Sequence, residues 1–178
     1  MKILVGALIL FGAAAQPAAA QDWDYSFAPT TDCLAEKGST GEAHQCFGAA
    51  AEACMEANDA GYSTMGMVSC MDQEARDWDR RLNKVYGLLR AAYKASDTEM
   101  AEIGATVPSR ADALRNMQRA WITFRDASCA YDRSHWGNGT GAGPAGVSCF
   151  LNMTARQAWS LEQDAQGWLE MNCNHEGC

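Results

Sequence analysis

The stretch LRNMQRAWITFRDASC, residues 114–129, and the later stretch CFLNMTARQAWSL, residues 149–161, decide the fold class of this chain. In the first stretch, apolar side chains recur every three or four residues, which is the period of an amphipathic α-helix. The second stretch repeats this spacing. A cysteine stands at the end of each stretch that faces the segment between them. The two stretches therefore predict a helical hairpin with cysteines placed to staple it.

Apolar side chains spaced by three and four predict further helices. The clearest lies over 68–92, and a shorter one is predicted over 41–57, where alanines, the best helix formers, carry the same spacing. The segment 96–98 is predicted to break the longer helix. A third helix is predicted to follow Pro108, whose fixed φ suits a first turn. Its core-facing stripe is predicted to consist of Leu114, Met117, Trp121, Phe124, Ser128 and Tyr131.

The predicted fold class is all-α, a disulfide-stapled helical bundle of about four helices, because the sequence lacks period-two runs of β-branched residues. The fourth helix is predicted from about Cys149 to Trp168. A long Gly-rich loop, residues 135–148, is predicted between the last two helices, and long loops of this kind are often functional. Residues 41–172 are thus expected to form one helical domain.

Two segments flank the predicted domain. Residues 21–40 are predicted to form an extended N-terminal arm. Its alternating aromatics Trp23, Tyr25 and Phe27 are expected either to pack on the domain or to form a contact patch. Residues 173–178 are predicted to be a small C-terminal tail.

Residues 1–20 have the three parts of a secretory signal peptide. Lys2 supplies the positive charge, residues 3–11 are apolar, and the alanines at 18–20 precede a cleavage expected before Gln21. The apolar run is shorter than a membrane span requires. No cysteine follows at a lipid-attachment position, so no membrane anchor is predicted. The expected location is the periplasm or outside the cell.

The eight cysteines all follow the predicted signal peptide. An even count in an exported chain indicates disulfide bonds, although sequence alone does not fix the pairing. Closeness in sequence favours Cys129 with Cys149 first and Cys54 with Cys70 next. The remaining cysteines would then pair as Cys33 with Cys46 and Cys173 with Cys178.

The chain is acidic, with a formal net charge of −8. Negative charge argues against nucleic acid and anionic membranes as partners and is compatible with a cationic partner. The same charge is also explained by solubility alone.

No catalytic motif, metal site or cofactor is predicted. Nucleophile motifs of the G-x-S-x-G kind are absent. Glu162 and Asp164 are two apart on a helix and so point to different sides, which favours a solvated face over a catalytic pair. The run from Cys173 through His175 to Cys178 could hold a metal, but cysteines in an exported chain are usually oxidised.

Five polar residues flank the apolar stripes of the predicted helices. A buried arginine needs a partner, and acids or amides on facing helices can supply one. We therefore predict an interhelical polar network, with binding of a small ligand as the alternative. The five are Asp79, Asn83, Gln118, Arg125 and Arg156.

Several of these residues belong to spaced motifs that identify a family. The motifs read Asp79-x-x-Leu82-Asn83-x-x-Tyr86, Gln118-x-x-Trp121-x-x-Phe124-Arg125-Asp126-x-x-Cys129 and Thr154-x-Arg156. Over roughly residues 54–167, the chain resembles the lysozyme-inhibitor LprI-like domain family. The resemblance implies a small exported α-helical domain with disulfides, which binds and blocks a lysozyme-like muramidase and is not itself an enzyme.

The long loop supplies the predicted contacts. An inhibitor that blocks a cleft needs a protruding, constrained segment, and the loop between Cys129 and Cys149 fits that need. Its predicted contact residues are His135, Trp136 and Asn138, since tryptophan is a frequent interface anchor. The alternative for Trp136 is packing back onto the bundle. The alternative partner is another envelope protein, bound without catalysis.

Overall fold

The computed structural model describes residues 22–172, which contain helices and no strand. The predicted all-α fold class is therefore confirmed, but the structure has five α-helices rather than about four. Two 3₁₀ turns join the first two helices. The elements are α1 (Ala28–Lys37), η1 (Gly38–Thr40), η2 (Ala43–Cys46), α2 (Ala49–Ala57), α3 (Thr64–Glu102), α4 (Arg110–Ser134) and α5 (Ala142–Asn172).

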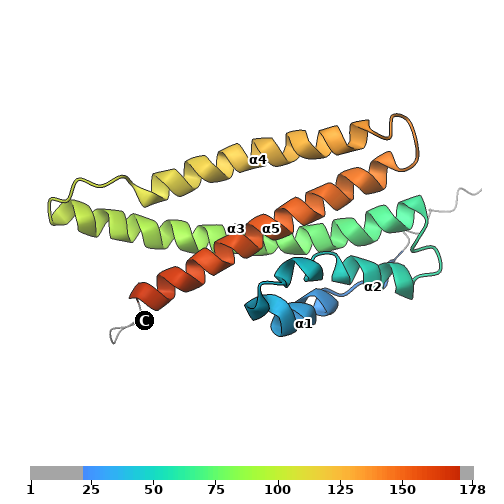
Figure 1. Ribbon diagram of the computed structural model, residues 1–178, viewed down its shortest axis with the longest axis horizontal. Helices are drawn as coiled ribbons and strands as arrows, with labels where there is room; N and C mark the ends of the chain where they lie inside the picture. The colour runs from blue at the N-terminus through green and yellow to red at the C-terminus, as the bar shows by residue number, and fades with distance from the viewer. Residues whose placement is uncertain (1–21, 173–178) are drawn as a thin grey trace, which may run out of the picture.

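Three long helices, α3, α4 and α5, build an elongated bundle (Figure 1). α3 and α5 cross and pack most extensively against each other, whereas α4 lies along one edge. The short helices α1 and α2 lie on the opposite side and, with the segments around them, form what we call the N-terminal lobe, residues 22–63. The turn between α4 and α5 lies at the same end of the molecule as the start of α3 (Figure 1).

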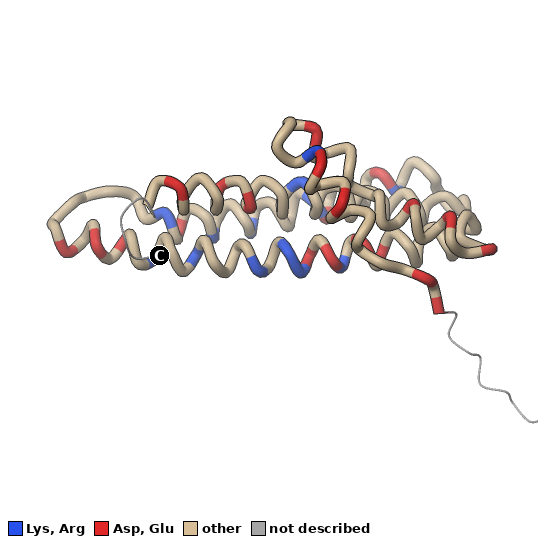
Figure 2. Tube along the Cα trace, turned by 90° about the horizontal axis from the view of Figure 1, so that it is seen from below, with Lys and Arg blue, Asp and Glu red and all other residues tan. Residues whose placement is uncertain are grey.

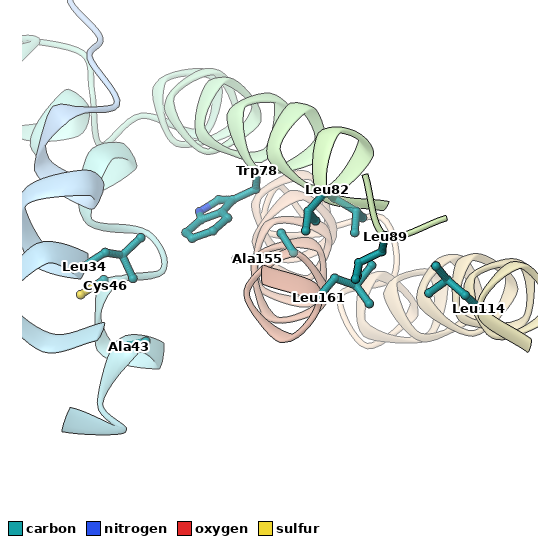
Figure 3. Close-up of a cluster of buried hydrophobic side chains, with 11 residues drawn as sticks. Leu34, Ala43, Cys46, Trp78, Leu82, Leu89, Leu114, Ala155 and Leu161 are labelled. Atoms are coloured by element: carbon teal, nitrogen blue, oxygen red, sulfur yellow. The ribbon is translucent and has the colours of Figure 1, made fainter. Parts of the chain in front are cut away.

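The main core lies where α3 and α5 cross and extends to α1 and α4 (Figure 3). Trp78 on α3 is fully buried, and its indole makes edge-on contacts with Phe27 and Phe47, at centroid distances of 5.6 and 5.2 Å. The N-terminal lobe is thus packed onto the bundle through aromatic contacts, which are favourable in this geometry. The other buried members include Leu34, Leu82, Leu89, Leu114, Ala155 and Leu161.

The N-terminal segment is more ordered than an extended arm. Residues 22–27 contain no helix, but Ala28–Lys37 form α1, with Pro29 in its first turn, so the predicted extended arm is wrong for that part. Proline is tolerated there because the first N–H groups of a helix have no intrahelical partner. The aromatics Trp23, Tyr25 and Phe27 pack against the two core clusters.

α3 does not break at residues 96–98, as the sequence had predicted, but continues to Glu102. Asp97 instead accepts hydrogen bonds from the Ser109 hydroxyl at 2.7 Å and from the N–H groups of Arg110 and Ala111 at 3.0 and 3.1 Å. Ser109 in turn caps α4 by accepting from the N–H of Asp112 at 3.0 Å. Asp97 therefore joins α3 to the first turn of α4 without interrupting its own helix.

The predicted loop over 135–148 is also shorter in the structure, because α5 begins at Ala142. Pro144 lies in the first turn of α5, where its missing N–H costs nothing. Small residues there allow close packing: Gly143 faces Val68 of α3, and the side chain of Arg133 lies across Gly146. The loop proper is therefore residues 135–141.

Three of the predicted disulfides are present. They join Cys33 to Cys46, Cys54 to Cys70 and Cys129 to Cys149, with Cα–Cα distances of 5.5, 5.7 and 5.4 Å. The predicted pairing of Cys173 with Cys178 lies outside the described residues, as does the predicted signal peptide.

The orientation of α4 differs from the prediction. Its buried face carries Ala111, Leu114, Gln118, Arg125 and Cys129. Met117, Phe124 and Tyr131, predicted to face the core, are exposed instead. Leu114 is buried and Trp121 packs against the core, as predicted, so the buried face of α4 is rotated from the predicted stripe rather than opposite to it. The buried face includes Gln118 and Arg125, two polar residues that the pattern placed only at the flank of the stripe.

Candidate functional site

The candidate site is the tip of the α4–α5 hairpin. The disulfide between Cys129 and Cys149 joins the two helices close to the tip. Beyond it, α4 continues to Ser134 and α5 begins at Ala142, so each helix projects further before the loop. The loop is therefore short and cross-linked at its base.

Backbone hydrogen bonds order the loop itself. The N–H of Gly139 donates to the carbonyl of Trp136 at 2.8 Å, and the N–H of Ala142 donates to that of Gly139 at 3.1 Å. Gly137 has φ 52°, in the left-handed region that glycine adopts without steric cost. The loop is a series of tight turns rather than an open chain.

The three residues predicted to make contacts all lie on this tip. Trp136 is 55% exposed, yet its ring lies over Gly141, where an added Cβ would be 2.1 Å from Cε3 of the indole. His135 packs edge-on against Tyr131 at a centroid distance of 4.4 Å. Asn138 is exposed. Trp136 is thus held by its own loop and still presents more than half of its surface.

An open groove of about 490 Å³ runs beside the tip, between α4 and α5. Its polar wall includes Ser128 and Asp132, and its apolar wall includes Trp136 and Met153. The groove is an open surface feature, which suits contact with a protruding chain better than enclosure of a small ligand. Its lining is completed by His135, Ala145, Ser148, Cys149 and Asn152.

The start of α3, at the same end of the molecule, adds exposed apolar side chains. Tyr62 and Met65 are both exposed. Partial desolvation is the main cause that raises the pKa of the Tyr62 phenol above its ordinary value of 10.0, and the nearby carboxylates of Glu56 and Glu52 raise it further. Acidic and aromatic side chains are therefore neighbours on this end of the N-terminal lobe.

Charge is distributed unevenly over the fold (Figure 2). The N-terminal lobe carries eight carboxylates and one lysine, Lys37, whereas acids and bases are mixed along the long helices. Most of the formal charge of −8 thus belongs to the lobe. The eight are Asp22, Asp24, Asp32, Glu36, Glu42, Glu52, Glu56 and Asp59.

The five residues predicted to form one polar network lie in separate places. Asn83 donates to Asp79 at 2.8 Å within α3, where Asn83 is exposed. Gln118 of α4 accepts from Gln157 of α5 at 3.0 Å, which is an interhelical contact. The other two, Arg125 and Arg156, are not part of either pair in the described hydrogen bonds.

Arg125 is buried against aromatic rings rather than in a network. Its guanidinium lies 4.9 Å from the Trp121 ring centroid and 4.1 Å from that of Phe150, and it forms an ion pair with Asp126 at 2.9 Å. Cation–π contacts of this kind stabilise a desolvated arginine. Arg156, in contrast, is exposed and lines a shallow groove with Phe47.

The strongest buried polar cluster centres on Glu74, which sequence analysis missed. This fully buried side chain accepts from the Thr30 hydroxyl at 2.9 Å and from the N–H groups of Gly48 and Ala51 at 2.9 and 2.7 Å. The indole N–H of Trp78 donates to it at 3.1 Å. Glu74 lies one helical turn before Trp78, on the buried face of α3. That position was the feature of the sequence from which its burial could have been predicted. Its role is structural, because it joins the N-terminal lobe to α3.

The described part of the chain offers no group of three or more His, Cys, Asp or Glu side chains placed to hold a metal ion. Across residues 22–172, none of the helices has the length and apolar character of a membrane span.

The fold and the tip define a disulfide-stapled all-α domain whose candidate site is an exposed, cross-linked helical hairpin. Residues 54–171 match the family model described as lysozyme inhibitor LprI, and because this match covers most of the chain, the protein belongs to that family. The resemblance predicted from the sequence motifs is thereby confirmed. Residues 22–53, most of the N-terminal lobe, precede the matched region.

Two relatives carry names that describe no activity. An uncharacterised protein of Rhizobium meliloti (strain 1021) is 43% identical over 67 residues, which cover 38% of this chain and 48% of the relative. An uncharacterised 17.7 kDa protein encoded in the puhA 5′ region of Rhodobacter capsulatus is 25% identical over 139 residues, 78% of this chain and 85% of the relative. No solved structure matches the chain.

Proposed function

We propose that this protein is an exported, non-catalytic inhibitor that binds a lysozyme-like muramidase through the α4–α5 tip. The observation that carries the proposal is membership of the LprI lysozyme-inhibitor family over residues 54–171. Three disulfides support the proposed export, since such bonds persist in oxidising compartments such as the periplasm.

The tip supplies the shape that a cleft-blocking inhibitor needs. It is narrow, cross-linked by Cys129 and Cys149, and carries Trp136, which is held by its own loop. A rigid aromatic anchor loses little conformational entropy on binding, so more of its contact energy is available for affinity.

The N-terminal lobe supplies the charge. Many lysozymes are cationic, and a partner of opposite charge is steered toward them by long-range attraction. Glu52 and Glu56 of α2 lie near exposed Tyr62, which precedes α3. α3 starts at the end of the molecule that carries the tip (Figure 1). Attraction of this kind mainly raises the association rate and weakens as salt screens it.

A turbidity assay tests the proposal. The oxidised mature protein is added in increasing amounts to chicken-type and goose-type lysozymes acting on bacterial cell walls. Inhibition that depends on dose and is relieved by salt is expected for at least one of the two enzymes. Absence of inhibition for both at high protein concentration would reject the lysozyme target and favour the alternative, an envelope protein of another kind.

Matched variants locate the site. Trp136→Ala is expected to weaken inhibition at least about tenfold, because an exposed aromatic anchor is lost. Leu169→Ala is the control, since Leu169 is similarly exposed, at 51%, but lies near the other end of α5. Equal inhibition by both variants would remove the tip from the interface.

The double variant Glu52→Gln/Glu56→Gln tests steering separately. It is expected to slow association and flatten the salt dependence while leaving dissociation nearly unchanged. Surface plasmon resonance at two salt concentrations measures both rates.

A further inference from the structure

The outer face of α4 carries an apolar stripe that the bundle does not cover. Every member of the stripe is exposed, and Phe124, at its middle, is 64% exposed. α4 lies along the edge of the bundle, with its buried face toward α3 and α5 (Figure 1). The stripe consists of Ala113, Met117, Ala120, Phe124, Ala127 and Tyr131.

The spacing of the stripe is that of a helix–helix contact. Its members alternate by four and three residues, the heptad pattern in which side chains of one helix insert between those of another. No member is charged, although five arginines and three aspartates lie elsewhere on the same helix. A continuous uncharged face of this length differs from scattered surface apolar residues, which need no explanation.

The stripe also alternates in size. Large side chains occupy Met117, Phe124 and Tyr131, seven residues apart, and alanines occupy the positions between them, also seven apart. Facing surfaces pack well when large residues on one meet small residues on the other. A surface that holds both sets in this order is complementary to its own antiparallel copy.

We propose that two copies of this protein associate through antiparallel α4 helices. A two-fold axis perpendicular to α4, between Ala120 and Phe124, places each large side chain opposite an alanine. Phe124 then faces the partner's Ala120, and Tyr131 faces the partner's Ala113. By the same symmetry, Met117 faces the partner's Ala127.

Charge supports the same register. Arg119 and Asp126 are seven residues apart, so they lie one behind the other along the same flank of α4. This flank is on the side of the stripe away from α5. In the antiparallel arrangement Arg119 comes level with the partner's Asp126, and the two-fold axis repeats this pair. A parallel arrangement in register would instead bring like charges together.

The proposed dimer uses neither Trp136 nor the N-terminal lobe. Trp136 is not a member of the stripe, and the antiparallel arrangement directs the two tips to opposite ends of the pair. The N-terminal lobes lie on the side of the bundle away from α4 (Figure 1). Trp136 and the N-terminal lobe therefore lie outside the proposed contact, whereas His135, which packs on Tyr131, borders it.

Sedimentation equilibrium of the oxidised mature protein, from low to several hundred micromolar, tests the proposal. The average mass of the wild-type protein is expected to rise from monomer toward dimer. Phe124→Asp is expected to weaken association at least about tenfold. Leu88→Asp is the matched control, because Leu88 is 61% exposed on α3 and lies outside the stripe. Circular dichroism confirms that both variants fold.

Charge reversal tests the register. Arg119→Asp is expected to weaken the dimer, and Arg119→Lys, which keeps the positive charge, is expected to leave it unchanged. A wild-type protein that stays monomeric throughout, or a dimer unaffected by Phe124→Asp, overturns the proposal. Equal association of Arg119→Asp and Arg119→Lys overturns the antiparallel register. Lysozyme inhibition by Phe124→Asp, measured in parallel, separates this result from the proposed function.

Discussion

The carboxylate of Glu74 on α3 accepts a hydrogen bond of 2.7 Å from the backbone N–H of Ala51, in the first turn of α2. The N–H of Gly48, the N-cap of α2, donates to the same carboxylate at 2.9 Å. A buried acid on one helix therefore caps another helix, at the end where the helix dipole favours negative charge. Thr30 connects the contact to α1, because its hydroxyl donates to Glu74 and accepts from Ala50.

Glu74→Ala is expected to lower the free energy of unfolding by about 3 kcal/mol or more, because four donors are left buried without a partner. Urea denaturation measures the change. Asp72→Ala is the control, since the Asp72–Arg76 pair on the same helix is exposed and should contribute less than about 1 kcal/mol. Equal midpoints for the two variants would contradict the anchoring role of Glu74.

Replacing Cys129 and Cys149 together with alanine is expected to destabilise the fold by about 3 kcal/mol, since the disulfide closes a segment of 20 residues. The double replacement avoids a free thiol that could form wrong pairs. Thermal unfolding under oxidising conditions measures the change. An unchanged thermal midpoint would show that packing alone holds the hairpin.

Asp97 is expected to make stability depend on acidity. Its hydrogen bond from Ser109 is the main cause that holds the pKa of this carboxyl below its ordinary value of 3.8 in the folded state. The stabilisation is therefore present above about pH 4 and is lost as pH falls through the lower folded pKa. Thermal midpoints of wild type and Asp97→Asn are expected to differ at pH 6 and to converge on acidification. A constant difference across this range would contradict the assignment.

Two glycines of α3 are expected to respond oppositely to alanine. At Gly66 an added Cβ would lie 2.2 Å from the carbonyl oxygen of Ala60, so Gly66→Ala forces backbone apart and should cost more than about 1 kcal/mol. At Gly87 nothing lies within 4 Å, and Gly87→Ala should stabilise the helix by about 0.5–1 kcal/mol. Chemical denaturation measures the free energy of unfolding of both variants. A change of the same sign in both would contradict the packing described for these two glycines.

The sequence was sufficient for most features that rest on local periodicity. The helical class, the central part of α3 and the three described disulfides follow from apolar spacing and cysteine placement. α1 was missed because its pattern is weak and it is held by contacts to Glu74 and Trp78, which are distant in sequence. The start of α5 was missed because glycines there serve close helix packing rather than a turn.

The segment that carries the predicted contact residues was predicted, but the packing around these residues was not. Residues 135, 136 and 138 lie on the tip, as expected, but no pattern showed that Trp136 packs over Gly141. The face of α4 was misjudged because burial of Arg125 depends on the rings of Trp121 and Phe150, the latter on another helix.

The two ends of the bundle are held together by different kinds of bond. Cys54–Cys70 and Cys129–Cys149 both lie toward the end that carries the tip, whereas the α3–α4 turn is held by the hydrogen bonds of Asp97. Thermal opening should thus begin at the turn and spread toward the covalent end, a gradient that amide hydrogen exchange would record. The tip is then the last part of the bundle to unfold. The conformational entropy of ordering it is therefore lost during folding and not again each time a partner binds.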